Sequence, residues 1–153
     1  MGRDVPRGMW YGGERGAQSD GGAIPKRIGA IIHHPEQRIL ELEWLEGSAS
    51  MTDDDFMRSM ERYAAFAEER RAPNMLVDVT RFRHSPGEHV APWRDEHIIP
   101  RYNAARVKKF AFLLPQGAPG TVEAGSQPER EPPGNFPTGY FADRQHLFDW
   151  FGA

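Results

Sequence analysis

The sequence predicts an α/β domain of about five strands whose inner strands run parallel and are joined by right-handed crossovers. Three observations predict it. Short apolar runs typical of strands alternate with helical patterns along most of the chain. The 153 residues fit one domain that is large enough to bury a core. The chain contains no cysteine, so its stability does not depend on disulfides, and this composition suits a reducing cytoplasm.

Residues 1–25 are predicted to be a disordered leader that precedes a single domain over residues 26–153. Seven of the first 22 residues are glycine and few are aliphatic. Such a segment buries too little apolar surface to offset an ordering cost of about 1–2 kcal/mol per residue. Met9, Trp10 and Tyr11 are the exception, since they offer an apolar anchor for the domain or for a partner.

The domain is predicted to begin with an antiparallel hairpin formed by "KRIGAIIHH" and "RILELEWLEG", with "PEQ" as the turn. In its second strand Leu40, Leu42 and Trp44 alternate with Glu41 and Glu43, which predicts one covered face and one solvent-facing face. We expect the hairpin at an edge of the sheet, where strand addition offers a route to a homodimer.

The clearest helix follows in "SMTDDDFMRSMERYAAFAEERRAP". Thr52 is the predicted N-cap, with Asp55 three residues later, and Pro73 ends the helix. Apolar residues at helical spacing form one stripe that is expected to pack on the sheet. These residues are Phe56, Met60, Tyr63, Ala64 and Ala67.

The second half of the chain continues the alternation. "NMLVDVTRF" and "VKKFAFLLP" are typical of strands buried on both faces. Between them, residues 85–106 are helical but contain Pro92 and Pro100, which predicts two short helices or one kinked helix. Residues 115–139 hold six prolines and five glycines and are predicted to form a long loop. "GYFADRQHLFDWFGA" closes the chain with a short strand and an amphipathic helix.

The order of these elements, the "LVDVTRF" strand with its Asp-containing turn, the "VKKFAFLLP" strand and the terminal "YFADRQHLFDWF" resemble STAS-like domains over about residues 26–153. This is the fold of anti-sigma-factor antagonists and of sulfate-transporter regulatory tails. The closest likeness is to a bacterial branch that is often grouped with the lipid-binding CRAL-TRIO fold. The resemblance implies a mixed sheet with an N-terminal hairpin, parallel inner strands and helices mainly on one face. It also implies regulated protein or ligand binding rather than catalysis.

Ser85 has two interpretations. In the antagonists, a hydroxyl at the start of the second helix accepts phosphate, and "HSPG" stands there in this sequence; Ser85 and Gly87 match that pattern, whereas His84 and Pro86 depart from it. The resemblance implies a candidate phosphoacceptor and protein-partner site, which comprises Ser85, Asp78, Arg81, Arg83 and Gly87. The residues themselves favour a capping box, because Ser85 precedes Glu88 by three positions with proline at the first helical position.

A second candidate function is the binding of a lipid or another apolar small molecule. Apolar and aromatic residues lie on the interrupted helical region and beside the proline-rich loop, where they could line a groove. They are Trp93, Ile98, Ile99, Tyr102, Phe136 and Tyr140. Ordinary core packing of these side chains is the alternative interpretation.

Other classes of function find little support in the sequence. Nineteen basic and 22 acidic residues are mixed along the chain and give a net charge of −3, unlike a nucleic-acid binder. No apolar stretch approaches the roughly 20 residues of a membrane span. His84, His89 and His97 are poorly spaced for a metal, and no nucleophile motif is present. We therefore predict a cytoplasmic, non-enzymatic protein without cofactor or metal, and a protein partner is the first expectation.

Overall fold

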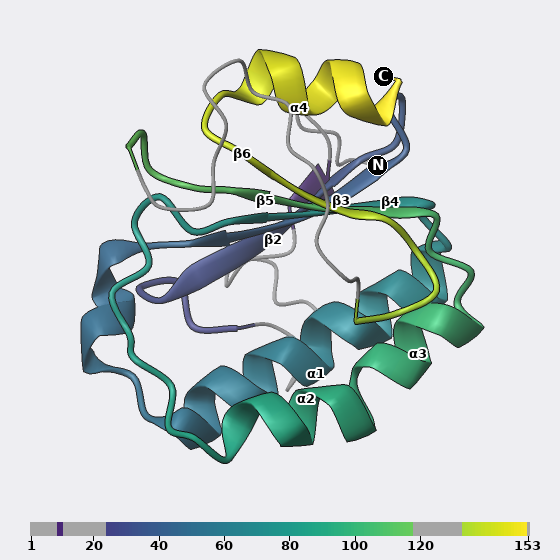
Figure 1. Cartoon of the computed structure of the whole chain (residues 1–153). Helices are drawn as coiled ribbons and strands as arrows, with labels where there is room; N and C mark the ends of the chain where they lie inside the picture. The colour runs from purple at the N-terminus through teal and green to yellow at the C-terminus, as the bar shows by residue number, and fades with distance from the viewer. Residues whose placement is uncertain (1–8, 11–23, 118–132, 153) are drawn as a thin grey trace.

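A computed structural model describes residues 9–10, 24–117 and 133–152 of the chain (Figure 1). It contains six strands, four α-helices and one 3₁₀ helix within these residues. In chain order they are β1 (Met9–Trp10), β2 (Gly29–His34), β3 (Ile39–Trp44), η2 (Glu46–Ser50), α1 (Asp53–Arg70), β4 (Asn74–Asp78), α2 (Val90–His97), α3 (Ile99–Ala104), β5 (Lys109–Leu113), β6 (Thr138–Phe141) and α4 (Arg144–Phe151).

The strands form one mixed sheet in which spatial order follows chain order from β1 to β6. The pairs β1–β2 and β2–β3 are antiparallel, and β3 to β6 run parallel to one another. Crossovers of one hand that step in the same direction along a sheet place their helices on the same face. Accordingly, α1, α2 and α3 cover one face and α4 covers the other (Figure 1). The predicted α/β class, with an N-terminal hairpin, parallel inner strands and helices mainly on one face, is confirmed.

The predicted end of the leader at residue 25 and the predicted edge position of the hairpin are wrong. Ile24 belongs to the predicted leader, yet its side chain is buried in the core. Met9–Trp10, which the sequence sets apart as an apolar anchor, pairs with β2 as the strand β1, so the hairpin is not the outermost pair of the sheet. The remaining leader residues, 1–8 and 11–23, and residues 118–132 of the predicted loop lie outside the described residues.

The sheet separates two hydrophobic cores. On the face of α1–α3, side chains from alternate strand positions such as Leu40, Met75 and Phe110 pack against the helices. On the α4 face, Leu76 and Leu147 belong to a second, smaller cluster. β4 thus contributes buried residues to both faces, as its continuous apolar run predicts. Among the described residues, no helix is both long enough and apolar enough to cross a membrane.

Helix α1 follows the sequence prediction closely. The Thr52 hydroxyl accepts a hydrogen bond from the Asp55 amide at 3.1 Å, and the Asp55 carboxylate accepts one from the Thr52 amide at 3.1 Å. This reciprocal arrangement satisfies two amides at the helix start. The helix ends at Arg70, before Pro73, and Tyr63 on its apolar stripe is fully buried.

The interrupted helical region forms two short helices rather than one kinked helix. α2 and α3 meet at Ile98, and Pro100 lies in the first turn of α3, where its missing N–H removes no intrahelical hydrogen bond. α3 packs against α1, whereas Val90 is the one buried residue of α2. α2 therefore covers the sheet less tightly than its neighbours do.

Candidate functional site

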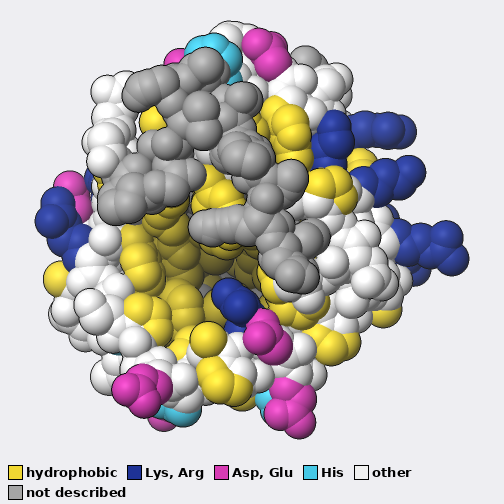
Figure 2. Space-filling model, viewed as in Figure 1, with side chains coloured by type: hydrophobic (Ala, Val, Ile, Leu, Met, Phe, Trp, Pro, Cys, Tyr) yellow, Lys and Arg dark blue, Asp and Glu magenta, His cyan; other side chains and the backbone are white. Residues whose placement is uncertain are grey.

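A pocket of about 600 Å³ lies between the sheet and helices α1–α3. Figure 2 shows it as a hollow lined by hydrophobic side chains, with charged side chains near its rim. Four cross-strand neighbours from β3, β4, β5 and β6 form its floor, because the sheet register aligns them in one row. They are Leu42, Val77, Phe112 and Tyr140. The volume falls in the range of pockets that bind small molecules, which is roughly 300–1,000 Å³.

The walls of the pocket come from the helices and from two loops. α1 contributes part of its apolar stripe, α2 contributes one side of its first turns, and α3 contributes its buried face. The helical lining residues are Phe56, Met60, Tyr63, Val90, Ala91, Arg94, Ile99 and Tyr102. Phe82 and Pro86 in the loop after β4 and Phe136 before β6 complete the wall. The pocket exists because α2 stands away from the sheet that α1 and α3 cover.

Tyr102 supplies an unpaired polar group to this apolar pocket. Its side chain is 1% exposed, and its hydroxyl has no hydrogen-bond partner among the described residues. A buried hydroxyl without a partner costs about 1–3 kcal/mol. Burial raises the pKa of Tyr102 far above its ordinary value, against the opposing effect of Arg101 and Arg94. The hydroxyl therefore stays protonated and retains a proton to donate.

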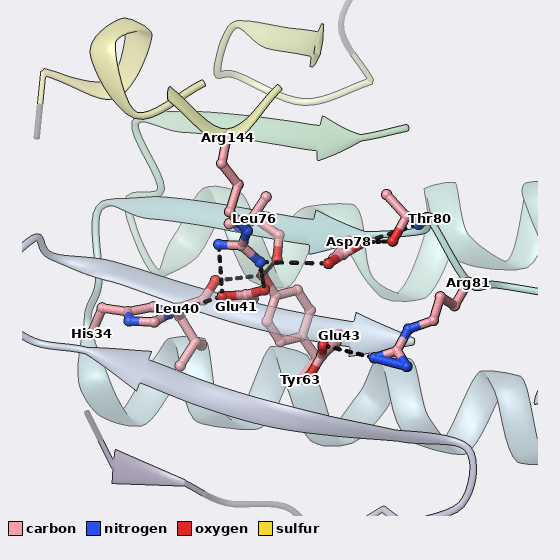
Figure 3. Close-up of polar contacts among 10 residues, drawn as sticks. All are labelled: His34, Leu40, Glu41, Glu43, Tyr63, Leu76, Asp78, Thr80, Arg81 and Arg144. Carbon is pink, nitrogen blue, oxygen red and sulfur yellow. Dashed lines mark hydrogen bonds and ion pairs between the residues drawn. The ribbon is translucent and has the colours of Figure 1, made fainter. Parts of the chain in front are cut away.

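Tyr63, the other fully buried tyrosine that lines the pocket, has a satisfied hydroxyl. Its proton is shared between the carbonyl oxygens of Leu40 at 2.7 Å and Leu76 at 2.9 Å, and its oxygen accepts the Leu76 amide at 3.1 Å. Figure 3 shows the Tyr63 ring reaching the sheet at the junction of β3 and β4. Tyr63 therefore joins two strands, whereas the buried Tyr102 hydroxyl has no partner among the described residues.

Asp53, the first residue of α1, holds the loop that forms one wall of the pocket. Its carboxylate lies 2.8 Å from His84 Nε2 and accepts the Gly87 amide at 3.2 Å. The hydrogen bond with His84 lowers the pKa of Asp53. Glycine suits this close approach, since a Cβ at residue 87 would lie 2.8 Å from the Asp53 carboxylate.

The predicted capping box at Ser85 is wrong. α2 begins at Val90, with His89 as its N-cap residue and no side-chain capping hydrogen bond. Ser85 lies four residues before His89 in an exposed part of the loop. The local S-x-x-E pattern is overridden because Asp53, distant in sequence, binds the Gly87 amide and His84 and holds the segment outside the helix.

The Ser85→Ala substitution is consequently expected to change the free energy of unfolding by less than about 0.5 kcal/mol. A capping serine would instead contribute about 1 kcal/mol. Urea unfolding of the two proteins measures the difference, and a loss near 1 kcal/mol would show that Ser85 caps a helix in solution.

The candidate phosphoacceptor residues do not form one cluster. Asp78 ends β4 on the α4 face, where its carboxylate accepts the Thr80 amide and hydroxyl at 2.9 and 2.7 Å. Arg81 reaches Glu43 at 3.5 Å. Arg83 and Ser85 are exposed on the loop, and Gly87 lines the pocket on the opposite face of the sheet.

Four of the six residues of the predicted apolar groove line the pocket. Ile99 and Tyr102 from α3, Phe136 and Tyr140 are among its lining residues. Ile98 is not among the lining residues, and its side chain is fully buried in the core. Trp93 is also absent from the lining, and it packs at the margin of the core beside His97.

A second polar cluster lies on the α4 face (Figure 3). Glu41 is 2% exposed and contacts His34 Nε2 at 2.8 Å and the guanidinium of Arg144 at the start of α4. Burial by itself raises the pKa of Glu41, but hydrogen bonds with His34 and Arg144 outweigh it and leave the pKa below its ordinary value. Burial, together with Glu41 and Asp78, raises the pKa of the neighbouring Glu43. The predicted solvent-facing side of β3 is therefore wrong at Glu41.

This ionic cluster was missed in the sequence because Glu41 and Arg144 are 103 positions apart. Their contact depends on the packing of α4 against β5 and β6, and no local pattern encodes it. Likewise, Arg94 at the pocket and Phe82 in its wall belong to segments whose sequence patterns indicate only a helix and a strand, although the strand β4 ends at Asp78.

The histidines that suggested a metal are divided between two places. His84 and His89 lie near Asp53, at 2.8 and 3.7 Å, whereas His97 lies beside Trp93. Within residues 24–117 and 133–152, no group of three or more His, Asp or Glu side chains is arranged to hold a metal ion. The pocket and the ionic cluster, on opposite faces of the sheet, are thus the two candidate sites. Comparisons with protein-family models, curated proteins and solved structures found no match to this chain.

Proposed function

We propose that this chain binds an apolar small molecule in the pocket between its sheet and helices α1–α3. The observation that carries the proposal is a hollow of about 600 Å³ whose lining is mainly apolar. Protein interiors are otherwise close-packed, and the lining of a void loses dispersion contacts that a ligand can restore. Pockets of this kind orient a ligand through a small number of polar groups, and the unpaired hydroxyl of Tyr102, one of the lining residues, is the one we propose here.

The charged residues around the pocket favour ligand binding over catalysis. Glu88 and Arg94 are the charged residues among its described lining, and Glu88 is exposed to solvent. Arg94 is paired with Asp95, because Arg94 Nη2 lies 2.8 Å from Asp95 Oδ1. Acid–base catalysis needs positioned groups with matched pKa values next to the substrate. The proposed function is therefore non-enzymatic ligand binding.

A substitution that fills the mouth of the pocket tests this function. Ala91 lines the pocket from an exposed position of α2, so Ala91→Trp is expected to block the mouth without disturbing the core. Binding of the neutral dye Nile red, followed by fluorescence titration, should saturate at one site in the wild type. We expect the affinity to fall at least about tenfold in Ala91→Trp, which corresponds to about 1.4 kcal/mol.

The matched control is Ala104→Trp, an equal increase in size at an exposed position of α3 outside the pocket lining. Its dye affinity should equal that of the wild type. Absence of saturable dye binding in the wild type, or equal loss in both variants, would contradict the proposal. Native mass spectrometry of gently purified protein adds a direct search for a retained small molecule.

Regulated protein binding, expected from the STAS-like resemblance, is our second proposed function. It is supported by the position of the exposed Arg81, Arg83 and Ser85, which belong to the same loop as the pocket residues Pro86 and Gly87. A partner bound to this loop would adjoin the ligand. Affinity purification from the native cell, with phosphopeptide mapping, tests it; recovery without a partner and without phosphate on Ser85 would contradict it.

A further inference from the structure

We propose that the pocket selects a planar aromatic or conjugated molecule carrying a neutral carbonyl-type acceptor, to which the Tyr102 hydroxyl donates a hydrogen bond. This inference rests on the proposed ligand-binding function and specifies the ligand class. Two independent observations carry it, namely the aromatic character of the pocket walls and the unpaired hydroxyl of Tyr102, one of the lining residues.

The walls are unusually rich in aromatic rings. Nine of the 22 lining residues are Phe, Tyr or Trp. Several rings form ordered pairs, such as Phe112 and Tyr140, which stack at 5.3 Å with planes 9° apart, and Phe110 and Phe136, which stack at 5.8 Å. Flat rings present faces and edges that match another flat ring in offset or edge-to-face geometry. An aliphatic chain gains buried area from such walls but not this geometric match.

The donor is fixed in place by neighbouring rings. Tyr102 contacts the rings of Tyr63, Phe110 and Phe136 at centroid distances of 6.3, 5.4 and 6.3 Å. The Tyr102 hydroxyl itself has no acceptor among the described residues. A ligand oxygen in the pocket would complete this hydrogen bond.

The acceptor is expected to be neutral rather than a carboxylate. An ionised carboxylate buried in an apolar pocket needs a cation as partner. Among the described lining residues the guanidinium of Arg94 is the cation, and Asp95 already binds it through both Nε and Nη2. A carbonyl oxygen requires only the neutral donor that Tyr102 provides. This separates the proposed ligand class from fatty acids.

Three probes test the inference by isothermal titration calorimetry. Menadione and methylnaphthalene share one fused-ring skeleton, and menadione adds two carbonyl groups; decanoate represents an aliphatic acid. The chain has no cysteine, so menadione cannot add to a protein thiol. We expect the wild type to bind menadione about tenfold more tightly than methylnaphthalene. In Tyr102→Phe this ratio should fall below about threefold, with the affinity for methylnaphthalene unchanged.

Each alternative result has a distinct meaning. Equal affinities of the two naphthalenes in the wild type, or an unchanged ratio in Tyr102→Phe, would overturn the donor role of Tyr102. Tighter binding of decanoate than of either ring would overturn the ligand class. In both cases saturable dye binding would leave the proposed function standing. If neither the dye nor any of the three probes binds the wild type, the proposed function and this inference both fail.

Discussion

Tyr63→Phe is expected to lower the free energy of unfolding by about 2–4 kcal/mol. The Tyr63 hydroxyl is the partner of the Leu76 amide and of the Leu40 and Leu76 carbonyl oxygens, all buried at the junction of β3 and β4. Removing it takes away the hydrogen bonds that it gives these backbone groups. Each buried group that loses its partner costs about 1–3 kcal/mol, which exceeds the gain from burying a less polar ring.

Tyr102→Phe is the matched control, because it removes the same atom from another fully buried tyrosine. The Tyr102 hydroxyl has no partner among the described residues, so its loss leaves no other polar group without a hydrogen bond. We expect the ligand-free variant to be as stable as the wild type or more stable by about 1 kcal/mol. Urea unfolding with an unchanged m-value measures both variants. Equal destabilisation by the two substitutions would show that Tyr102 has a structural partner in solution.

The contrast between the two tyrosines explains which parts of the site the sequence could predict. Helical spacing in α1 correctly assigns Tyr63 to the face that packs on the sheet, because periodicity reports burial. Periodicity does not report whether a hydroxyl meets a backbone group. The same spacing assigns Phe56 and Met60 to the core, although both also line the pocket, because nothing in α1 indicates that α2 stands away from the sheet.

Long-range contacts account for the predictions that failed. The S-x-x-E pattern at Ser85 is a valid local signal, but Asp53 in α1 binds the adjacent backbone and the helix starts at Val90 instead. Alternation in β3 predicts a solvent-facing Glu41, yet α4 lies over that face and brings Arg144 to it. The strands, α1 and the break between α2 and α3 were predictable because each depends on residues within its own segment.

Arg144→Met is expected to lower the free energy of unfolding by about 2 kcal/mol at pH 7. Removing one partner of a fully buried ion pair costs about 3–5 kcal/mol. We expect less here because the Arg144 side chain is 42% exposed and solvent screens its charge. Glu41, in contrast, is 2% exposed and, among the described residues, would retain the hydrogen bond with His34 as its remaining side-chain contact. Arg81→Met is the control, since the Arg81–Glu43 pair is 3.5 Å apart and more exposed, so a loss below about 0.5 kcal/mol is expected.

The pH dependence of this loss distinguishes an electrostatic cause from a packing defect. In the wild type the folded-state pKa of Glu41 lies below its ordinary value of 4.5, so the stabilisation is present above pH 4.5 and disappears as the pH falls through the folded-state pKa. Without Arg144, burial pushes the pKa of Glu41 upward, and its ionised form is destabilising at neutral pH. Once acid protonates Glu41 in both proteins, Arg144 loses its nearest carboxylate partner and keeps the longer contact with Asp78 at 3.5 Å. The difference in the free energy of unfolding between Arg144→Met and the wild type should therefore shrink by at least about half between pH 7 and pH 4.

Adding Glu41→Gln to Arg144→Met should likewise recover part of the lost stability at pH 7. A difference that stays constant from pH 7 to pH 4 would instead identify lost packing of α4 as the cause.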